Sequence, residues 1–394
     1  MGRYNFDKIV DRKHTKSLKY DFAVQRGKPA DVLPFWVADM DFEIPSELKQ
    51  VLLDRVNHGI FGYTESDDAY FNVLKEWFAS RFNWNIDKKW LVKTPGVVFA
   101  LAMAVRAFTE EGEGVLINQP VYYPFSMVID DNDRNLINVP LIQEADTYTI
   151  DFEGVERAIV EHNVTLFLLC NPHNPVGRVW TEDELKRLGD ICIKHNVIII
   201  SDEIHADFVW DGHKHTVFAN LGESYAEHCI VCTAPSKSFN IAGLQVSNIF
   251  IPNDSLRRRF VKEIDRAGYS QLNTMGLVGC QGAYEVGGPW LDELKGYIQG
   301  NIQYTLDYFK EHLPKLHMYR PEGTYLMWFD CSELPLTPEE RERWLLNDAK
   351  LWLDSGSMFG KDGEKFERIN VACPRAILTE GLEALRRAYV AKGF

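Results

Sequence analysis

Three short polar segments of the chain carry side chains that could do chemistry together: an amide, a carboxylate and an amine. They are residues 170–177 with Asn174, 201–205 with Asp202, and 234–238 with Lys237. A lysine amine kept partly desolvated is a nucleophile, whereas a lysine in a solvated loop is a surface charge. Position alone favours the solvated loop for Lys237. The chemical interpretation therefore depends on whether the three segments meet in the folded chain.

Each of these segments follows directly on an apolar run. The runs are 164–169, 197–200 and 230–232, and two similar runs lie at 115–117 and 249–251. Continuous apolar runs are typical of strands buried on both faces. Between the first two, Thr181 to Glu184 has the pattern of a capping box and predicts a helix that ends near His195. Strand, helix and strand predict an α/β protein with a mainly parallel sheet, whose ligands collect at the carboxyl ends of the strands.

Asn174, Asp202 and Lys237 at neighbouring strand ends match the needs of pyridoxal 5′-phosphate. The aldehyde of this cofactor needs a Schiff-base lysine, its pyridine nitrogen needs a carboxylate that keeps it protonated, and its 3′-oxygen needs a donor. The three side chains fit these roles in the order Lys237, Asp202, Asn174. The sequence therefore predicts a pyridoxal-phosphate site.

The pattern of the chain changes from about residue 289. A long helical stretch runs through Leu313, strand-like pieces follow at 323–330 and 369–372, and a final helix closes the sequence. This pattern predicts a smaller α+β domain. We expect an N-terminal segment (1–45) that packs on the small domain and the active site, a large cofactor-binding domain (46–287) and a small C-terminal domain (288–394). Because no linker composition marks the boundary near 285, we expect it inside a continuous helix.

Composition excludes several functional classes. The 394 residues contain 43 Lys plus Arg and 57 Asp plus Glu, a formal charge of −14 that disfavours nucleic acid as a partner. No apolar stretch approaches the ~18 to 20 residues of a membrane span, and the start, Met1 to Asp7, lacks a secretory apolar region. We expect a cytoplasmic protein without membrane partners. The seven scattered cysteines predict reduced core thiols, including Cys229 and Cys232, whose redox spacing falls in an apolar run.

Other motifs are incomplete. Gly112-Glu113-Gly114 lacks the third glycine of a dinucleotide fingerprint, and 356–361 is one residue short of a P-loop. The group of His205, Asp207, His213 and His215 matches no zinc spacing, and we interpret His213 and His215 as solvated surface residues. We therefore expect no metal.

With these residues in view, the sequence resembles the fold type I pyridoxal-phosphate enzymes of the aminotransferase class I/II family, and within it the MalY/PatB-type cystathionine β-lyases. The resemblance covers almost the whole chain. Its landmarks are Trp36 to Phe42, Phe61 to Thr64, Pro95 to Val98, Pro120 to Tyr122, Asn171 to Gly177, Asp202 to Asp207, Lys237 to Leu244, and Ala372 to Arg375. It implies a large domain with a mainly parallel, seven-stranded-type sheet and a smaller α+β domain.

The resemblance also implies roles around the cofactor ring. Lys237 is then the Schiff-base and catalytic lysine, Asp202 meets the pyridinium nitrogen, and Asn174 meets the 3′-oxygen. Tyr122 stacks on the ring face as a further catalytic residue, with Tyr123 as its rival.

The phosphate and the substrate are given other residues. Gly96, Val97 and Val98 would open a helix toward the phosphate, with Ser236 nearby. Tyr63 is implied to reach the site of a partner subunit, which predicts a homodimer. Arg375 is implied to bind the α-carboxylate of the substrate, together with Asn174 and the backbone at Ala38.

Three positions depart from the wider family. His205, which is expected to contact the cofactor, stands where many relatives have a tyrosine that reaches the 3′-oxygen. Ala234 replaces a common phosphate-binding hydroxyl, and Gln245 replaces a common arginine. Ser236 and Tyr63 could compensate at the phosphate. The departures favour a lyase over a transaminase.

The resemblance implies a carbon–sulfur β-lyase that converts L-cystathionine or S-substituted L-cysteines to a thiol, pyruvate and ammonia, with Lys237 as general base. Two alternatives stay open. The same core residues would serve an aminotransferase, and MalY-type relatives combine lyase activity with binding of a transcription factor, so a regulatory protein is the second alternative. Neither the leaving-group preference nor a partner surface can be inferred from these residues.

Overall fold

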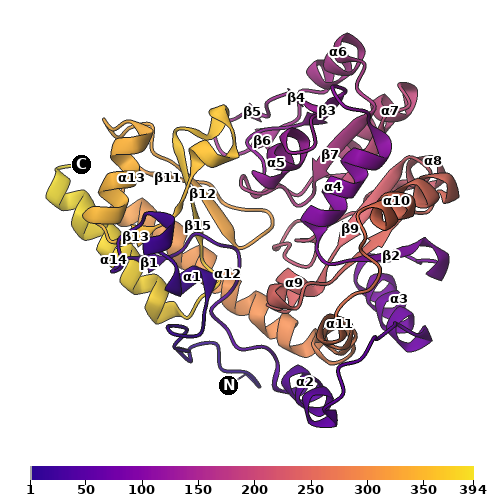
Figure 1. The fold of residues 1–394 in the computed structure, drawn as a ribbon. Helices are drawn as coiled ribbons and strands as arrows, with labels where there is room; N and C mark the ends of the chain where they lie inside the picture. Colours follow the sequence, from indigo (N-terminus) through magenta and orange to yellow (C-terminus); the bar gives the residue numbers. More distant parts are fainter. Residues whose placement is uncertain (1) are drawn as a thin grey trace.

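The computed structural model of the chain describes residues 2–394, so Met1, the first residue of the predicted N-terminal segment, lies outside the described residues. Its largest feature is a seven-stranded sheet (Figure 1). In spatial order the strands are β2 (Leu91–Thr94), β10 (Ser247–Phe250), β9 (Cys229–Thr233), β8 (Ile198–Asp202), β7 (Leu166–Cys170), β3 (Gly114–Ile117) and β4 (Asn135–Asn138).

Side chains alternate between the two faces of this sheet, and helices cover both. In β7, Leu166 and Leu168 pack with α4, α5 and α10, whereas Phe167 and Leu169 belong to the core on the other face, with α3 and α7. Burial on both faces explains why the strands read as continuous apolar runs. The helices of this part are α2 (Ser46–His58), α3 (Asp68–Phe82), α4 (Val97–Phe108), α5 (Pro124–Asp130), α6 (Phe152–His162), α7 (Glu182–Lys194), α8 (Glu223–Ala226), α9 (Pro235–Ser238), α10 (Asp254–Arg266) and α11 (Thr274–Val286).

The sheet is mainly parallel, as predicted, and it has one reversal. Strands β9, β8, β7, β3 and β4 are parallel, and β10 is antiparallel to both β9 and β2. The apolar run at 249–251 could not show this, because an interior antiparallel strand that is buried on both faces reads like a parallel one. The predicted helix after Thr181 is present as α7, with the capping box formed.

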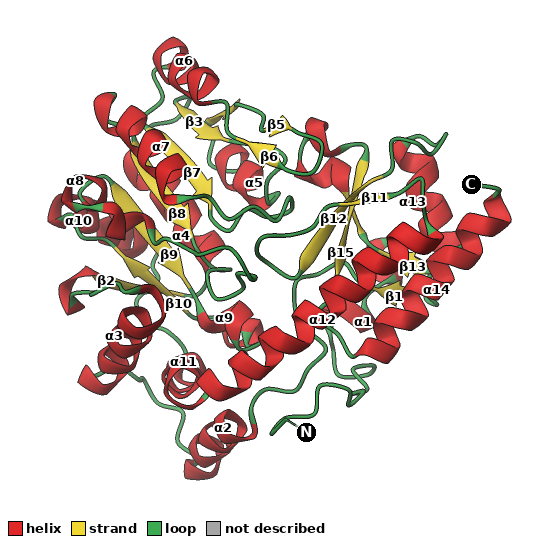
Figure 2. Ribbon diagram, turned by 180° about the vertical axis from the view of Figure 1, so that it is seen from behind, coloured by secondary structure: helices red, strands yellow, loops and turns green. Residues whose placement is uncertain are grey.

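A smaller antiparallel sheet lies beside the first and is backed by two long helices, α12 (Gly288–His312) and α14 (Arg375–Lys392) (Figure 2). Its strands, in order, are β11 (His317–Met318), β12 (Leu326–Asp330), β15 (Phe366–Asn370) and β14 (Asp354–Ser355), with α13 (Pro338–Asn347) beside them. Two-stranded pairs are β1 (Leu33–Pro34) with β13 (Leu351–Trp352), and β5 (Ile142–Gln143) with β6 (Tyr148–Thr149). A short helix, α1 (Leu18–Asp21), lies near the start of the chain.

The helix expected to continue through residue 285 is interrupted. The helix α11 ends at Val286 and α12 begins at Gly288. Pro289, in the first turn of α12, has no N–H and disfavours continuation of a helix through it. Gly287 packs so closely that an added Cβ would lie 2.5 Å from the Phe239 ring. The prediction of a continuous helix was wrong, and the division at 287/288 stays a proposal.

Residues 36–42, which we call the strap, cross from the small sheet to the lysine-bearing part of the large sheet. Asn370 Nδ2 donates to the carbonyls of Val37 and Asp39, both at 2.8 Å. On the other side, Asn240 accepts from Met40 N–H at 2.9 Å and donates to the Phe42 carbonyl at 2.9 Å. Hydrogen bonds to β15 of the small sheet and to the segment after α9 thus hold the strap between the two parts of the molecule. Within residues 2–394, no helix combines the length and the apolarity that crossing a bilayer requires.

Candidate active site

The ends of three neighbouring strands bring the predicted residues together. Cys170, the last residue of β7, pairs with Asp202, the last residue of β8, and Asp202 pairs with Cys232 in β9. Asn174 lies four residues after the end of β7, and Lys237 lies in α9, four residues after β9. The parallel register therefore places all three side chains at one edge of the sheet, as expected.

A cavity of about 430 Å³ opens at this edge. Ten residues to which the sequence analysis gave a role in the site line it: Ala38, Gly96, Val97, Val98, Tyr122, Asn174, Asp202, His205, Ser236 and Lys237. The other two departures from the wider family, Ala234 and Gln245, line it as well. Tyr63 and Arg375 do not lie in this lining.

Lys237 is the one amine in the described lining of the cavity. Its Nζ donates to the carbonyl oxygen of Ala38 at 3.4 Å. Burial lowers the pKa of Lys237 to about 8, although the carboxylates of Asp39 and Asp202 oppose this effect. A lowered pKa keeps a larger fraction of the amine neutral at physiological pH, and only the neutral amine is nucleophilic.

Asp202 is buried, and burial raises its pKa to about 7 even though the Ile204 N–H donates to Oδ1 at 3.1 Å. A carboxylate in this situation is stabilised by a cationic partner. His205, two positions further, is also buried, and burial lowers its pKa well below the usual value, with the charge of Lys237 adding to the effect. His205 is therefore neutral at the wall of the cavity, and within residues 2–394 its Nδ1 has no hydrogen-bond partner.

Arg368 of β15 is the residue that the sequence analysis missed. Its Nη1 donates to Asn174 Oδ1 at 2.9 Å, and its Nη2 donates to the Trp36 carbonyl at 2.9 Å and pairs with Asp354. Nε is buried without a partner in the described chain. Arg368 stands directly before the predicted strand-like piece at 369–372, and a charge at the start of a buried strand was the available signal, because a buried charge needs partners.

Arg375, predicted to bind a carboxylate, is placed elsewhere. It is the first residue of α14, its Nε donates to Asn301 of α12 at 2.8 Å, and its guanidinium carbon lies 4.5 Å from the centre of the Tyr304 ring. Because α14 begins here, the side chain packs along α12 instead of turning toward the strand ends. Arg375 does not line the cavity, and its predicted binding of a carboxylate stays a prediction, whereas Arg368 supplies the guanidinium that contacts Asn174.

Tyr122 and its rival Tyr123 point to different surroundings. Tyr122 lines the cavity, whereas the Tyr123 ring packs 6.0 Å from that of Phe359. Burial raises the pKa of Tyr122 far above its usual value, so the phenol stays protonated. An aromatic face beside Lys237 suits the flat ring of a cofactor.

The N-terminus of α4 forms the far end of the cavity. The helix has 12 residues with Gly96 as its N-cap, and Gly96, Val97 and Val98, which the sequence analysis assigned to the phosphate, line the cavity. The first N–H groups of a helix have no partner within it and, with the helix dipole, favour an anion. Ser236 adds a hydroxyl in the same lining.

Tyr63 lies outside the cavity. Its side chain is 97% exposed, in an extended segment after α2 with Phe61, which is 56% exposed. Within the single chain Tyr63 has no role in the cavity, so its predicted reach into a partner subunit stays a proposal.

Two side predictions about titratable residues can be compared with the structure. His213 is exposed, but His215 is buried and its Nε2 lies 2.8 Å from Glu203 Oε2. The prediction of a solvated His215 was wrong, because Glu203 supplies a buried partner that the sequence pattern did not reveal. Cys229 and Cys232 are free thiols in β9, and they pack into the cores on opposite faces of the sheet.

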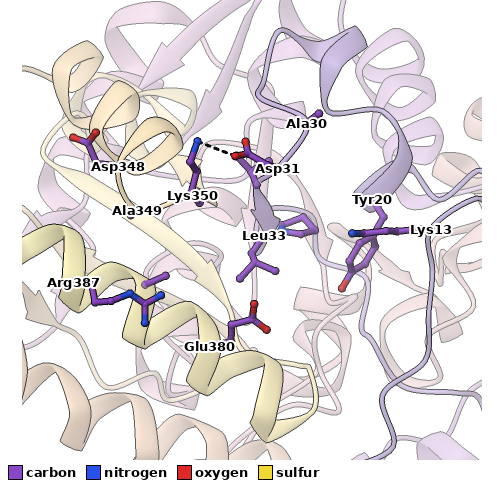
Figure 3. Close-up of a pocket in the computed structure, with 13 residues that line it drawn as sticks. Lys13, Tyr20, Ala30, Asp31, Leu33, Asp348, Ala349, Lys350, Glu380 and Arg387 are labelled. Carbon is purple, nitrogen blue, oxygen red and sulfur yellow. Dashed lines mark ion pairs between the residues drawn. The ribbon is translucent and has the colours of Figure 1, made fainter.

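A second hollow of similar volume, about 430 Å³, lies away from the strand ends (Figure 3). It is bordered by the segment around Leu33 and by Arg387 of α14. Lys350 pairs with Asp31 across its rim at 2.9 Å. Neither Lys237 nor Asp202 contributes to it, so we place the chemistry in the cavity at the strand ends.

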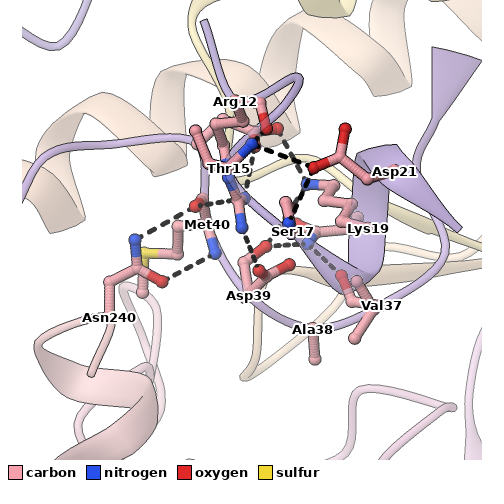
Figure 4. Close-up of polar contacts among 12 residues, drawn as sticks. Arg12, Thr15, Ser17, Lys19, Asp21, Val37, Ala38, Asp39, Met40 and Asn240 are labelled. Atoms are coloured by element: carbon pink, nitrogen blue, oxygen red, sulfur yellow. Dashed lines mark hydrogen bonds and ion pairs between the residues drawn. The ribbon is translucent and has the colours of Figure 1, made fainter. Parts of the chain in front are cut away.

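The strap closes the site from the N-terminal side, and charged residues secure it (Figure 4). Arg12 Nη2 donates to Asp39 Oδ2 at 2.5 Å, and Nη1 donates to Asp41 Oδ1 at 2.7 Å. The buried Lys19 donates to Asp41 Oδ2 at 2.8 Å. The sequence analysis placed the backbone at Ala38 in the site and gave no role to Asp39 or Arg12.

The donor set of the cavity fits pyridoxal phosphate. The single amine fits its aldehyde, the destabilised carboxylate of Asp202 fits a protonated ring nitrogen, and the helix N-terminus fits a phosphate dianion. His205 lines the cavity, and its buried Nδ1, which has no partner in the described chain, further indicates that the cavity is built to hold a polar group. Fold and site together define an α/β enzyme whose cavity suits a pyridoxal-phosphate cofactor.

Comparison with known proteins agrees. The sequence profile of the family described as aminotransferase class I and II matches residues 30–385, and the chain belongs to this family. It is 42% identical over 384 residues to "Cystathionine beta-lyase PatB" of Bacillus subtilis, with 98% of this chain and 99% of that protein covered. Among solved structures, cystalysin from Treponema denticola, which contains pyridoxal 5′-phosphate, superposes with a TM-score of 0.95 at 39% identity and 99% coverage of each chain. The PLP-bound C-S lyase from Staphylococcus hominis gives a TM-score of 0.91 at 33% identity, with 98% of each chain covered.

Proposed function

We propose that this protein is a pyridoxal-phosphate-dependent carbon–sulfur β-lyase that converts L-cystathionine or related S-substituted L-cysteines to a thiol, pyruvate and ammonia. The observation that carries the proposal is the meeting of Lys237, Asp202 and Asn174 around one cavity, with Arg368 bound to Asn174. This arrangement occurs in a chain 42% identical over its whole length to a cystathionine β-lyase.

Within this proposal, Lys237, Asp202 and the N-terminus of α4 hold the cofactor, and Tyr122 and His205 border its ring. When bound, the cofactor supplies an electron sink for the electron pair left at the substrate α-carbon. Asp202 carries the negative charge that keeps the ring nitrogen protonated. Its raised pKa of about 7 in the isolated chain shows how strongly this buried carboxylate needs a cationic partner.

Lys237 moves the proton. As a buried amine with a pKa lowered to about 8, it can accept the α-proton of the substrate and give it up again near neutral pH. Loss of the β-thiolate then completes the elimination, and water hydrolyses the released 2-aminoacrylate to pyruvate and ammonia. The Ala38 carbonyl, 3.4 Å from Nζ, is the acceptor that orients the amine.

Arg368 binds the α-carboxylate of the substrate. The guanidinium is held by Asn174, Trp36 and Asp354, and its Nε is buried without a partner. A guanidinium fork offers parallel donors that match a carboxylate. Asn174, which accepts from Arg368 through Oδ1, keeps its amide N–H groups for the cofactor oxygen or the substrate.

We also propose a homodimer in the cytoplasm, in which Tyr63 reaches the cofactor phosphate of the partner subunit. The near-complete exposure of Tyr63 supports this, because large aromatic side chains exposed together with other apolar residues mark interfaces. Small amino acids are the proposed substrates.

The test is release of pyruvate from L-cystathionine without any added 2-oxo acid, followed through coupled lactate dehydrogenase. L-Alanine, which has no leaving group, is the control substrate, and Lys237→Ala is the control variant. We expect pyruvate from the parent enzyme with L-cystathionine alone. Transfer of the amino group to an added 2-oxo acid, without pyruvate from L-cystathionine, would instead assign aminotransferase chemistry.

A further inference from the structure

Asp39 is the charged residue of the strap next to the catalytic lysine. It follows Ala38, whose carbonyl accepts from Lys237 Nζ at 3.4 Å and from the Tyr325 hydroxyl at 2.7 Å. Asp39 and Lys237 line a common cavity of about 530 Å³ on the N-terminal side of the site. The carboxylate and the amine therefore lie on the wall of the same space.

The two carboxylate oxygens of Asp39 have different surroundings. Oδ2 accepts from Arg12 Nη2 at 2.5 Å. Oδ1 is fully buried, and no donor within residues 2–394 contacts it. A buried carboxylate oxygen without a donor is costly, so a cation or donor is expected to meet it in the working enzyme.

The backbone of Asp39 is fixed, so its carboxylate has little freedom to turn away. The Asp39 carbonyl accepts from Asn370 Nδ2 at 2.8 Å and from Lys19 Nζ at 3.3 Å. Arg12 also binds the Met40 carbonyl at 3.1 Å and Asp41 at 2.7 Å, and this fixes its guanidinium beside Asp39. A simple ion pair at the surface would not require so many contacts, so we interpret them as fixing the position of the Asp39 carboxylate.

Two carboxylates act on the amine, the buried Asp202 and the partly buried Asp39, and they have separate tasks. Asp39 raises the pKa of Lys237 more strongly than Asp202 does, against the lowering by burial and by Arg368. Once Asp202 faces the ring nitrogen of the cofactor, its charge is committed there. Asp39 is then the carboxylate left to balance a proton on Lys237.

We infer that Asp39 is a positioning residue whose carboxylate, fixed by Arg12, holds the Lys237 nitrogen in place and stabilises its protonated form. Through it, the position of the strap controls how readily the lysine keeps the α-proton and returns it. The inference rests on the proposed function only in taking Lys237 as the base.

The charged and titratable groups around this pair come from several elements. The N-terminal segment contributes Arg12, Lys19 and Asp41, the large sheet contributes Asp202 and His205, and the small sheet and its neighbouring segment contribute Arg368 and Tyr325. All of them stay unchanged when Asp39 alone is altered. A shift that follows only Asp39 is therefore attributable to its charge.

The experiment is a pH titration of the visible absorbance of the holoenzyme, which reports the protonation of the cofactor-bound nitrogen of Lys237 and needs no substrate. Asp39→Asn removes the charge and keeps the shape. Because the negative charge favours the protonated nitrogen, we expect the midpoint to fall by about one pH unit. In steady-state assays we expect kcat to fall roughly 10- to 100-fold, with KM changed less than about 3-fold.

Glu43→Gln is the matched control. Glu43 lines the same cavity but pairs with Lys8 at the surface, so this variant removes one charge without affecting Lys237. Its midpoint should equal that of the parent, and Asp39→Glu should return the midpoint toward the parent value. If Asp39→Asn does not fold, Asp39→Ser is titrated instead.

Equal midpoints in the Asp39 variants and in Glu43→Gln overturn the inference. A parent enzyme that shows the titration but releases no pyruvate from L-cystathionine contradicts the proposed function and leaves the result for Asp39 standing.

Discussion

Burial acts in opposite directions on the two charged groups at the strand ends. It raises the pKa of Asp202 to about 7 and lowers that of Lys237 to about 8, so each group moves toward its neutral form. In the proposed enzyme, the cofactor relieves both effects: its positive ring nitrogen stabilises the charged Asp202, and its aldehyde reacts with the neutral amine of Lys237. Without the cofactor, the cost of these two charges should be visible in the pH dependence of stability.

Asp202 gives the first prediction at the residue scale. Its folded pKa of about 7 lies above the unfolded value of 3.8, so the folded chain holds more protons between these values and loses stability as the pH rises from about 4 to 7. Protein freed of cofactor should show this slope, and Asp202→Asn should flatten it. At pH 7.5 the variant should be more stable by about 2–4 kcal/mol. Urea unfolding at pH 5 and 7.5 measures the difference, and equal slopes in both proteins contradict the prediction.

The choice between two arginines gives the second prediction. Arg368→Lys keeps the charge beside Asp354 but loses the fork, so kcat/KM should fall at least about 100-fold, mainly through KM. Arg375→Lys is the matched control and should stay within about 3-fold of the parent, because Arg375 packs on Tyr304 outside the cavity. Steady-state kinetics with L-cystathionine measure both. A larger loss in Arg375→Lys than in Arg368→Lys would restore the assignment to Arg375.

At the scale of elements, the sequence predicted what depends on local pattern. The apolar runs before Asn174, Asp202 and Lys237 define strands, and the parallel register then brings the three together. The role of Arg368 could not be predicted, because it comes from a contact with Asn174, which lies 194 residues earlier in the sequence and follows a strand of the other sheet. The antiparallel direction of β10 could not be predicted for a related reason: the apolar pattern of one strand does not show which strands it pairs with or in which direction.

The strap is the element for which a third prediction follows. Asn240, in a left-handed conformation with φ of 55°, makes three hydrogen bonds to it, to Met40 N–H, the Met40 carbonyl and the Phe42 carbonyl. Asn240→Gly keeps the backbone conformation but loses these bonds, so stability should fall by about 1–3 kcal/mol. The N-terminal segment should also be cleaved faster by protease, and cofactor should dissociate faster.

Asn196→Gly is the control for this element. Asn196 also has a left-handed conformation, with φ of 56°, but it is an exposed residue just after α7. The same change of residue type there should leave cleavage of the N-terminal segment and release of cofactor at the parent rates. Equal effects of the two substitutions would show that the strap does not depend on Asn240.

At the scale of the whole molecule, the exposed Tyr63 makes the proposed dimer testable by complementation. Lys237→Ala and Tyr63→Ala should each be inactive or nearly so as homodimers. If Tyr63 completes the site of the partner, a mixed dimer has one site with both defects and one site with neither. Random mixing of subunits in equal amounts puts half of the chains in mixed dimers, so activity should return to about a quarter of the parent value.

Activity is measured after the two variants are unfolded and refolded together with cofactor, and separately refolded samples are the control. No recovery in a preparation that contains mixed dimers would show that Tyr63 acts within its own subunit or not at all.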